Sequence, residues 1–143
     1  MARKKKELPL LEGVSITGLA SEGKALTHVE GKVLFVPFAA PGDICDIQVT
    51  KKKNSFMEGK IARLTTSSPQ RVTPICSHFT VCGGCKWQHL PYSLQLESKA
   101  QVVRDALERI GKVPVGEYLP ILGSKQTERY RNKLEFTFSH KRW

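Results

Sequence analysis

The stretch Asp43 to Thr50, DICDIQVT, decides the fold, because its apolar and polar residues alternate. Successive side chains of a β-strand point to opposite faces of a sheet, so Cys45, Ile47 and Val49 share one face while polar residues fill the other. The stretch therefore predicts a strand that buries one face in a core and turns the other toward solvent.

Four further segments with a similar short, alternating pattern surround this strand: VSITGLA (14–20), KALTHV (24–29), KVLFVPF (32–38) and MEGKIARL (57–64). Turn signals such as Pro41-Gly42 separate them. About five short antiparallel strands in so little chain bury a core only by curling. We therefore predict a mainly β fold with an OB-like barrel at residues 10–66, after a basic leader at residues 1–9.

The rest of the chain, residues 67–143, carries a different pattern. A polar connector, TTSSPQRVTP (65–74), precedes a cysteine-rich segment. Between Pro91 and Gly111, apolar residues recur at steps of three or four, which predicts one amphipathic helix. Its apolar stripe consists of Tyr92, Leu96, Ala100, Val103, Leu107 and Ile110. The segment RNKLEFTFS (131–139) alternates again and predicts a strand. One helix and one strand make a poor core, so we expect the sequence to be a piece of a larger fold, cut at the start of an α/β central domain. The alternative is a native C-terminus that folds back on the barrel.

The composition favours a polyanionic partner. The chain has 23 Lys and Arg against 13 Asp and Glu, a formal net charge of +10, and a field of this size attracts nucleic acid. A merely basic, soluble surface is the alternative. No run approaches the roughly 20 apolar residues that cross a bilayer, and the start MARKKKELPLLEG lacks the apolar region of a signal peptide. We expect a cytoplasmic protein without a membrane partner.

The cysteines predict a metal site. Cys76, Cys82 and Cys85 lie in the run CSHFTVCGGCKWQH (76–89), and thiolates at this spacing suit zinc or an iron-sulfur cluster. His89 could complete a Cys3His zinc site, whereas an iron-sulfur cluster requires a fourth cysteine. Cys45 is better explained as a buried thiol of the barrel core. A fourth cysteine ligand would therefore lie outside this sequence, and spacing alone leaves both metals open.

Several of these runs resemble one known family. CSHFTVCGGCKWQHLPYSLQLESK (76–99) is similar to the cysteine motif of the class I RNA (uracil-5-)-methyltransferases, particularly the 23S ribosomal RNA branch. GVSITGLASEGKAL (13–26), VLFVPFAAPGD (33–43) and SSPQRVTPIC (67–76) resemble the RNA-binding TRAM domain that precedes that motif. RYRNKLEFTF (129–138) is similar to the strand that enters the family's central domain.

The resemblance implies a 4Fe-4S cluster with Cys76, Cys82 and Cys85 as three of its ligands and a fourth ligand beyond this chain. It also implies that the intact protein uses S-adenosylmethionine to methylate uracil C5 in RNA, with 23S ribosomal RNA as the expected partner. The catalytic cysteine and general base of the family lie outside this sequence, so we predict no catalytic residue here and no activity of the chain alone. We further expect a monomer.

Basic residues are the candidate RNA contacts. Lys51, Lys52 and Lys53 are predicted at the tip of a hairpin, where phosphates can be reached, although a solvated loop would look the same. The other candidates are Lys86, Arg131 and Lys133. Trp87 is interpreted as a shield of the cluster against water rather than a base-stacking ring.

Two other classes of protein share some of these features. One is a free-standing RNA-binding module with a structural Cys3His zinc site. The other is a methylthiotransferase, which fits less well because that family uses C-x3-C-x2-C and places its TRAM domain at the C-terminus.

Overall fold

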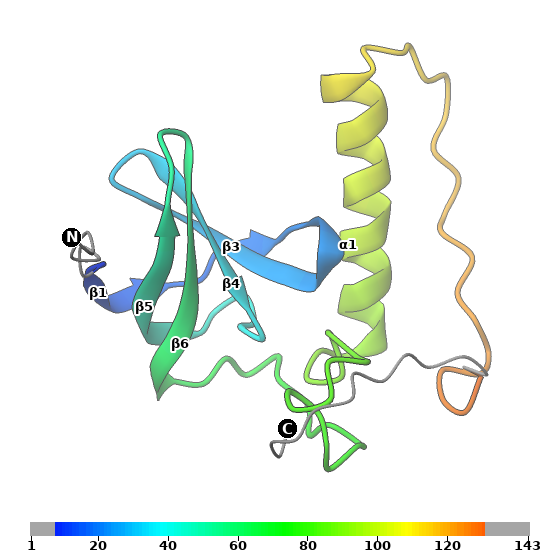
Figure 1. Cartoon of the computed structure of the whole chain (residues 1–143). Helices are drawn as coiled ribbons and strands as arrows, with labels where there is room; N and C mark the ends of the chain where they lie inside the picture. Colours follow the sequence, from blue (N-terminus) through cyan, green and yellow to red (C-terminus); the bar gives the residue numbers. More distant parts are fainter. Residues whose placement is uncertain (1–7, 131–143) are drawn as a thin grey trace, which may run out of the picture. The chain divides into compact units, whose positions relative to one another are not determined.

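The computed structural model describes residues 8–130 (Figure 1). The chain divides into two compact units between Arg71 and Val72, and each unit is described by itself below. The predicted strand at residues 131–139 lies outside the described residues.

The first unit is a single mixed sheet whose strand order is β1-β5-β6-β4-β3-β2. A 3-10 turn at Ser21–Gly23 separates β2 from β3. The strands are β1 (Leu10–Ser15), β2 (Gly18–Leu19), β3 (Lys24–Val29), β4 (Lys32–Pro37), β5 (Ile44–Lys52) and β6 (Phe56–Thr66). All pairs are antiparallel except β4 with β6, which are parallel. The prediction of about five antiparallel strands is thus corrected to six strands with one parallel pair.

The sheet curls into a half-barrel. The run 14–20, predicted as its first strand, is divided between β1 and β2 at the two edges of the sheet. β1 pairs with β5 at one edge of the sheet, and β2 pairs with β3 at the other. Ile16 donates its backbone N–H to Asp43 and accepts from Gly42, while Thr17 donates to Leu26. Two residues therefore carry the chain from one edge to the other, which confirms the predicted OB-like architecture and explains why the run 14–20 is not one continuous strand.

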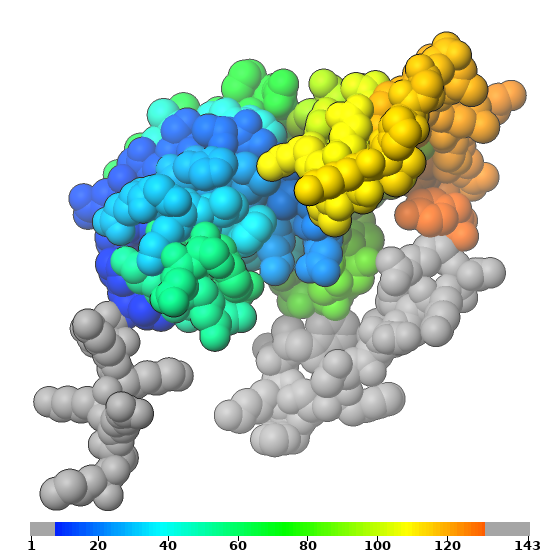
Figure 2. Space-filling model, turned by 90° about the horizontal axis from the view of Figure 1, so that it is seen from above, coloured from blue at the N-terminus to red at the C-terminus, as the bar shows by residue number. Residues whose placement is uncertain are grey.

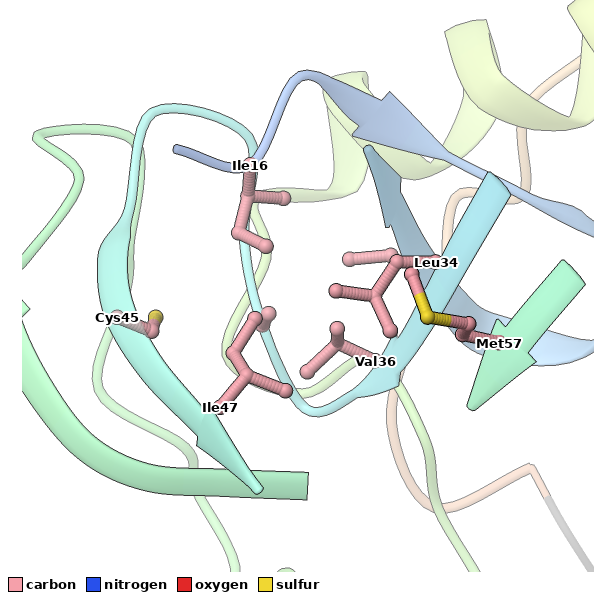
Figure 3. Close-up of a cluster of buried hydrophobic side chains, with 8 residues drawn as sticks. Ile16, Leu34, Val36, Cys45, Ile47 and Met57 are labelled. Atoms are coloured by element: carbon pink, nitrogen blue, oxygen red, sulfur yellow. The ribbon is translucent and has the colours of Figure 1, made fainter. Parts of the chain in front are cut away.

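The core lies on the concave side of this sheet (Figure 3). The predicted inward face of the opening stretch is confirmed, since Cys45, Ile47 and Val49 are buried. Around them pack Ile16, Ala25, Leu34, Val36, Ala39 and Met57. Gly59 belongs to the same interior, because a Cβ atom there would overlap Ile47 Cγ2 and lie 3.1 Å from the Gln48 carbonyl oxygen. Only glycine permits β5 and β6 to approach this closely.

A buried ion pair ties the segment that follows β6 back to the turn before β5. The fully buried Asp43 carboxylate accepts hydrogen bonds from Arg71 (2.6 Å from the terminal nitrogen) and from the backbone N–H groups of Ala40 and Ser68, at 2.6 and 2.9 Å. Arg71 also donates to the carbonyl oxygen of Phe38 at 2.9 Å. Burial acts to raise the pKa of Asp43, but these donors and the Arg71 charge hold that pKa below its usual value. We call Asp43, Ser68 and Arg71 the latch.

The second unit contains one helix and long irregular segments. α1 (Tyr92–Asp105) begins directly after Pro91 and continues as a π-helical turn at Ala106–Ile110. The predicted helix is thus confirmed in extent. Gly111 follows the last helical residue but keeps a right-handed conformation, and the left-handed residue is Lys112, with φ 51°.

The chain then returns along the first half of α1. Ser124 donates its backbone N–H to the Tyr92 hydroxyl at 2.8 Å, and Gly123 lies against Leu96. The second half of the predicted apolar stripe is exposed in this unit, with Ile110 at 82% of its accessible surface. Among residues 8–130, no helix has the length and apolar character needed to cross a bilayer.

Candidate nucleic-acid interface and cysteine segment

The predicted lysine-bearing hairpin is present between β5 and β6. A β-bulge in it determines which face of the sheet carries Lys51. β5 and β6 pair through Val49↔Gly59 and then Lys51↔Glu58, so the register shifts between them. Without the shift, Lys51 would share the inward face of Val49. The bulge places it on the outer face, opposite Glu58.

On that outer face Lys51 contacts both a carboxylate and a ring. Its Nζ lies 3.9 Å from Glu58 Oε1 and 5.6 Å from the centroid of the Phe56 ring. Lys24 Nζ lies 3.8 Å from the same Glu58 oxygen. Phe56 also meets Phe35 edge to face, with ring centroids 6.1 Å apart and an interplanar angle of 65°. We call Lys24, Phe35, Lys51, Phe56 and Glu58 the outer cluster.

The other two lysines of the triplet join neighbouring hairpin tips. Lys52 Nζ lies 3.5 Å from Glu30 Oε2, and the Lys53 carbonyl accepts a hydrogen bond from Lys32 Nζ at 3.2 Å. The β3–β4 and β5–β6 tips lie side by side (Figure 1), and the β5–β6 tip is at the molecular surface in Figure 2. The tip is therefore a structured basic surface.

Sequence reasoning missed the two phenylalanines and Glu58. The alternation that sends Leu34 and Met57 inward also sends Phe35 and Phe56 outward, so the rings could have been found from the same pattern. The pairing of β4 with β6, which brings the rings together, joins segments more than twenty residues apart. No local pattern reveals that pairing.

The cysteine segment, residues 76–89, is held by local hydrogen bonds. The backbone N–H of Cys76 donates to the Gln88 side chain at 3.1 Å, and Gly84 donates to Cys82 Sγ at 3.4 Å. Hydrogen bonds to the sulfurs are among the features that tune iron-sulfur clusters. Cys76, Cys82 and Cys85 are free and half-buried.

The thiols have the chemistry of a metal site, but they are not gathered as ligands. Across residues 8–130 no three His, Cys, Asp or Glu side chains lie close enough together to hold a metal ion. His89, the alternative zinc ligand, is buried with its ring 5.4 Å from that of Phe79. The thiols fit a thiophilic metal by their donor type and the Gly84 bond, and the choice of metal stays a prediction.

Trp87 lies within the cysteine segment, and its buried indole N–H has no hydrogen-bond acceptor among the described residues. The Gln95 side chain donates to the backbone carbonyls of Trp87 and Leu90, at 3.1 and 2.9 Å, and so attaches the segment to α1. Lys86 is exposed. The candidates Arg131 and Lys133 lie outside the described residues.

Cys45 belongs to the core and not to this segment. It is fully buried, and burial together with the nearby Asp43 charge raises the pKa of its thiol to about 11. A neutral, inaccessible thiol neither binds metal nor attacks a substrate. The sequence-based assignment of Cys45 to the core is confirmed.

The chain is similar in sequence to proteins named as RNA methyltransferases. Residues 12–62 match the family model of the TRAM domain. The chain is 63% identical over 130 residues to a Porphyromonas gingivalis protein named as an uncharacterized RNA methyltransferase, covering 91% of this chain and 28% of that protein. It is 38% identical over 137 residues to the 23S rRNA (uracil(1939)-C(5))-methyltransferase RlmD of Francisella tularensis subsp. novicida, covering 93% of this chain and 30% of that protein.

The chain is also similar to a solved structure, that of the Pyrococcus abyssi tRNA (uracil-54, C5)-methyltransferase in complex with S-adenosyl-L-homocysteine. The identity is 31%, the TM-score is 0.39, and the match covers 74% of this chain and 23% of that one. The chain thus spans less than a third of the length of the relatives that it matches.

Proposed function

We propose that this chain, a member of the RNA methyltransferase family with a TRAM domain at residues 12–62, is the RNA-binding part of a cytoplasmic, monomeric 23S ribosomal RNA (uracil-5-)-methyltransferase. The observation that carries the proposal is the lysine-bearing hairpin surface on a domain of this family, in a chain whose relatives are named as RNA methyltransferases. Lys51, Lys52 and Lys53 contact phosphates of the substrate. Lys86, Arg131 and Lys133 are further RNA contacts proposed from the sequence.

The reaction proposed for the intact enzyme explains why such a grip is needed. Carbon 5 of uracil becomes nucleophilic only after a nucleophile adds to carbon 6, and S-adenosylmethionine supplies the methyl group. A base inside folded RNA must be extruded to be reached. This chain holds the surrounding strand, and we assign none of its residues, including its four cysteines, to the chemical step.

We further propose that Cys76, Cys82 and Cys85 hold a 4Fe-4S cluster in the intact protein, with a fourth ligand from beyond these residues. The donor set and the Gly84 hydrogen bond to Cys82 support a thiophilic metal. Trp87 would shield the bound cluster from water. The competing assignment is a zinc site completed by His89, in a free-standing RNA-binding module.

RNA binding is tested by the salt dependence of affinity. Fluorescence anisotropy with a single-stranded 23S-derived oligonucleotide should give a log affinity that falls with log salt by about 0.7 per phosphate contacted. Replacing Lys51, Lys52 and Lys53 by Gln should flatten that slope. The control makes the same change at Lys99, Lys112 and Lys125, which are exposed in the second unit. A flat response of the unmodified chain would contradict the proposal.

The metal is tested by analysis of iron, sulfide and zinc after anaerobic purification. We expect to find iron and sulfide. Their content should be lower when Cys76, Cys82 or Cys85 is replaced by Ser, and it should be unchanged in Cys45→Ala. Zinc without iron or sulfide, lost again in His89→Ala, would establish the competing site instead. Methylation is tested with the full-length gene product and labelled S-adenosylmethionine, where transfer to a position other than uracil C5 would contradict the assignment.

A further inference from the structure

We propose that the outer cluster is a stacking site for a base of single-stranded RNA, in which Glu58 holds two ammonium groups until a phosphate replaces it. The proposal rests on the proposed RNA-binding function and goes beyond it by naming the rings that read a base and the carboxylate that restrains the lysines.

The rings of Phe35 and Phe56 lie on the outer face of the sheet, opposite the core. Phe35 and Phe56 alternate with the buried Leu34 and Met57, so both point outward from the sheet. The strand register sets Phe35 opposite Glu58 and Val33 opposite Phe56, which makes the two rings diagonal neighbours. The two rings meet edge to face at 6.1 Å, and both residues are half-buried rather than enclosed. A partly exposed aromatic pair on a sheet surface offers the flat apolar face on which bases stack.

Positive charge flanks the rings on more than one side. Lys51 Nζ lies over Phe56, Lys24 comes from β3, and the exposed Lys60 follows Glu58 on the same face of β6. Glu58 is the carboxylate among them. A base with its phosphate matches this combination, because the ring stacks and the phosphate pairs with ammonium groups. An acidic protein segment would use the charges but leave the rings without a role.

Glu58 restrains both lysines loosely. The N···O distances of 3.8 and 3.9 Å are longer than those of a charge-assisted hydrogen bond. The three side chains are about one third to one half exposed, at 36% for Lys24, 49% for Lys51 and 33% for Glu58. Loose, solvated pairs exchange partners easily. An incoming phosphate can therefore take both ammonium groups, while the Glu58 carboxylate lowers affinity by repelling it.

The stacking role is tested with Phe35→Leu and Phe56→Leu, which keep an apolar side chain and remove the ring. Anisotropy with a single-stranded oligonucleotide should show about tenfold weaker binding for each variant. With an abasic oligonucleotide of equal length, the same variants should bind as the unmodified chain does. Equal losses on both oligonucleotides would overturn the stacking role, and thermal melts check that each variant folds.

The restraining role is tested with Glu58→Gln against Glu12→Gln. Both changes add the same net charge, and Glu12 lies on β1, away from the rings, with no ion pair among the described residues. Glu58→Gln should bind several-fold tighter at low salt with a steeper salt slope, while Glu12→Gln should change affinity less. Weaker or unchanged binding in Glu58→Gln would overturn the role.

The two proposals fail separately. If the unmodified chain binds RNA and loses affinity in the lysine triplet variant, but the phenylalanine variants are unaffected, only the stacking site is wrong. If no RNA binding is seen, the proposed function is wrong. Competition by polyglutamate as strong as by single-stranded RNA would assign the cluster to an acidic protein partner and overturn the proposal.

Discussion

The two units of this chain differ in how completely they bury their own side chains. In residues 8–71, alternating strands enclose a core and the latch closes the segment that follows β6 onto it. In residues 72–130, His89 and Leu90 are the buried residues among those described, and α1 buries none. The first unit carries within itself the contacts that specify its fold. The second is organised mainly by local hydrogen bonds, which leaves its cysteines and half of its apolar stripe exposed or half-buried.

The largest effect should come from breaking the latch. Asp43→Ala leaves the Arg71 guanidinium without its buried partner, so we expect a loss of about 3 to 5 kcal/mol in the free energy of unfolding. Urea unfolding followed by circular dichroism measures it. Glu30→Gln, which breaks an exposed pair, should cost no more than about 1 kcal/mol. Equal losses in both variants would show that the latch does not set the stability of the first unit.

The latch also predicts the pH dependence of stability. Because the pKa of Asp43 is lowered in the folded state, its contribution is fully present above the unfolded pKa of about 3.9 and is lost as pH falls through the lower folded value. In the unmodified chain, the urea concentration at the unfolding midpoint should therefore decrease as the pH is lowered from 6 to 2. The fall should be smaller in Asp43→Asn, and an equal fall would contradict the assignment.

A smaller loss should follow Gly59→Ala, since the added Cβ overlaps Ile47 where β5 and β6 approach each other. We expect about 1 to 3 kcal/mol of destabilisation, as in other overpacked cores. Gly31→Asn is the matched control, because a Cβ at Gly31 meets nothing within 4 Å and Asn tolerates its φ of +72°. Thermal melts of both variants should separate a packing effect from a general intolerance of glycine replacement.

Thiol labelling should distinguish Cys45 in the first unit from the three cysteines of the second unit. In the metal-free chain at pH 8, iodoacetamide should modify Cys76, Cys82 and Cys85, while the buried Cys45, with its thiol pKa raised to about 11, stays unmodified. Peptide mass spectrometry gives the extent at each site. Labelling of Cys45 as fast as the other three would show that the first unit opens readily.

The smallest effect should come from the exposed end of the apolar stripe. Ile110→Lys changes a side chain that is 82% exposed, so the unfolding free energy of the chain should shift by less than about 0.5 kcal/mol. A loss above 2 kcal/mol would mean that Ile110 is buried in solution and that the second unit packs more of its apolar side chains than this exposed fraction indicates.

The difference in burial between the two units also explains which features could be predicted from the sequence. Alternation located β3, β4, β5 and β6 and the inward Cys45, Ile47 and Val49, because the partners that bury those residues lie in neighbouring segments of the same pattern. It missed residues 10–13 of β1, which precede the predicted run 14–20. It could not locate the latch, since Asp43 and Arg71 are 28 residues apart and no period links them. It also could not show that a bulge turns Lys51 onto the outer face.

For the cysteines, spacing predicted ligands without predicting their geometry. A C-x2-C turn places two thiols near each other in sequence, but the described residues hold no third partner in range. The metal assignment therefore depends on the resemblance, whereas the barrel follows from side-chain periodicity alone.

The central claim, that RNA is held on the outer face of the first unit, is tested most directly by lysine acetylation of the full chain with and without single-stranded RNA. Mass spectrometry should show Lys24, Lys51 and Lys52 protected by RNA, while Lys99, Lys112 and Lys125 react at unchanged rates. Protection confined to the second unit, or equal protection of all six lysines, would contradict the account.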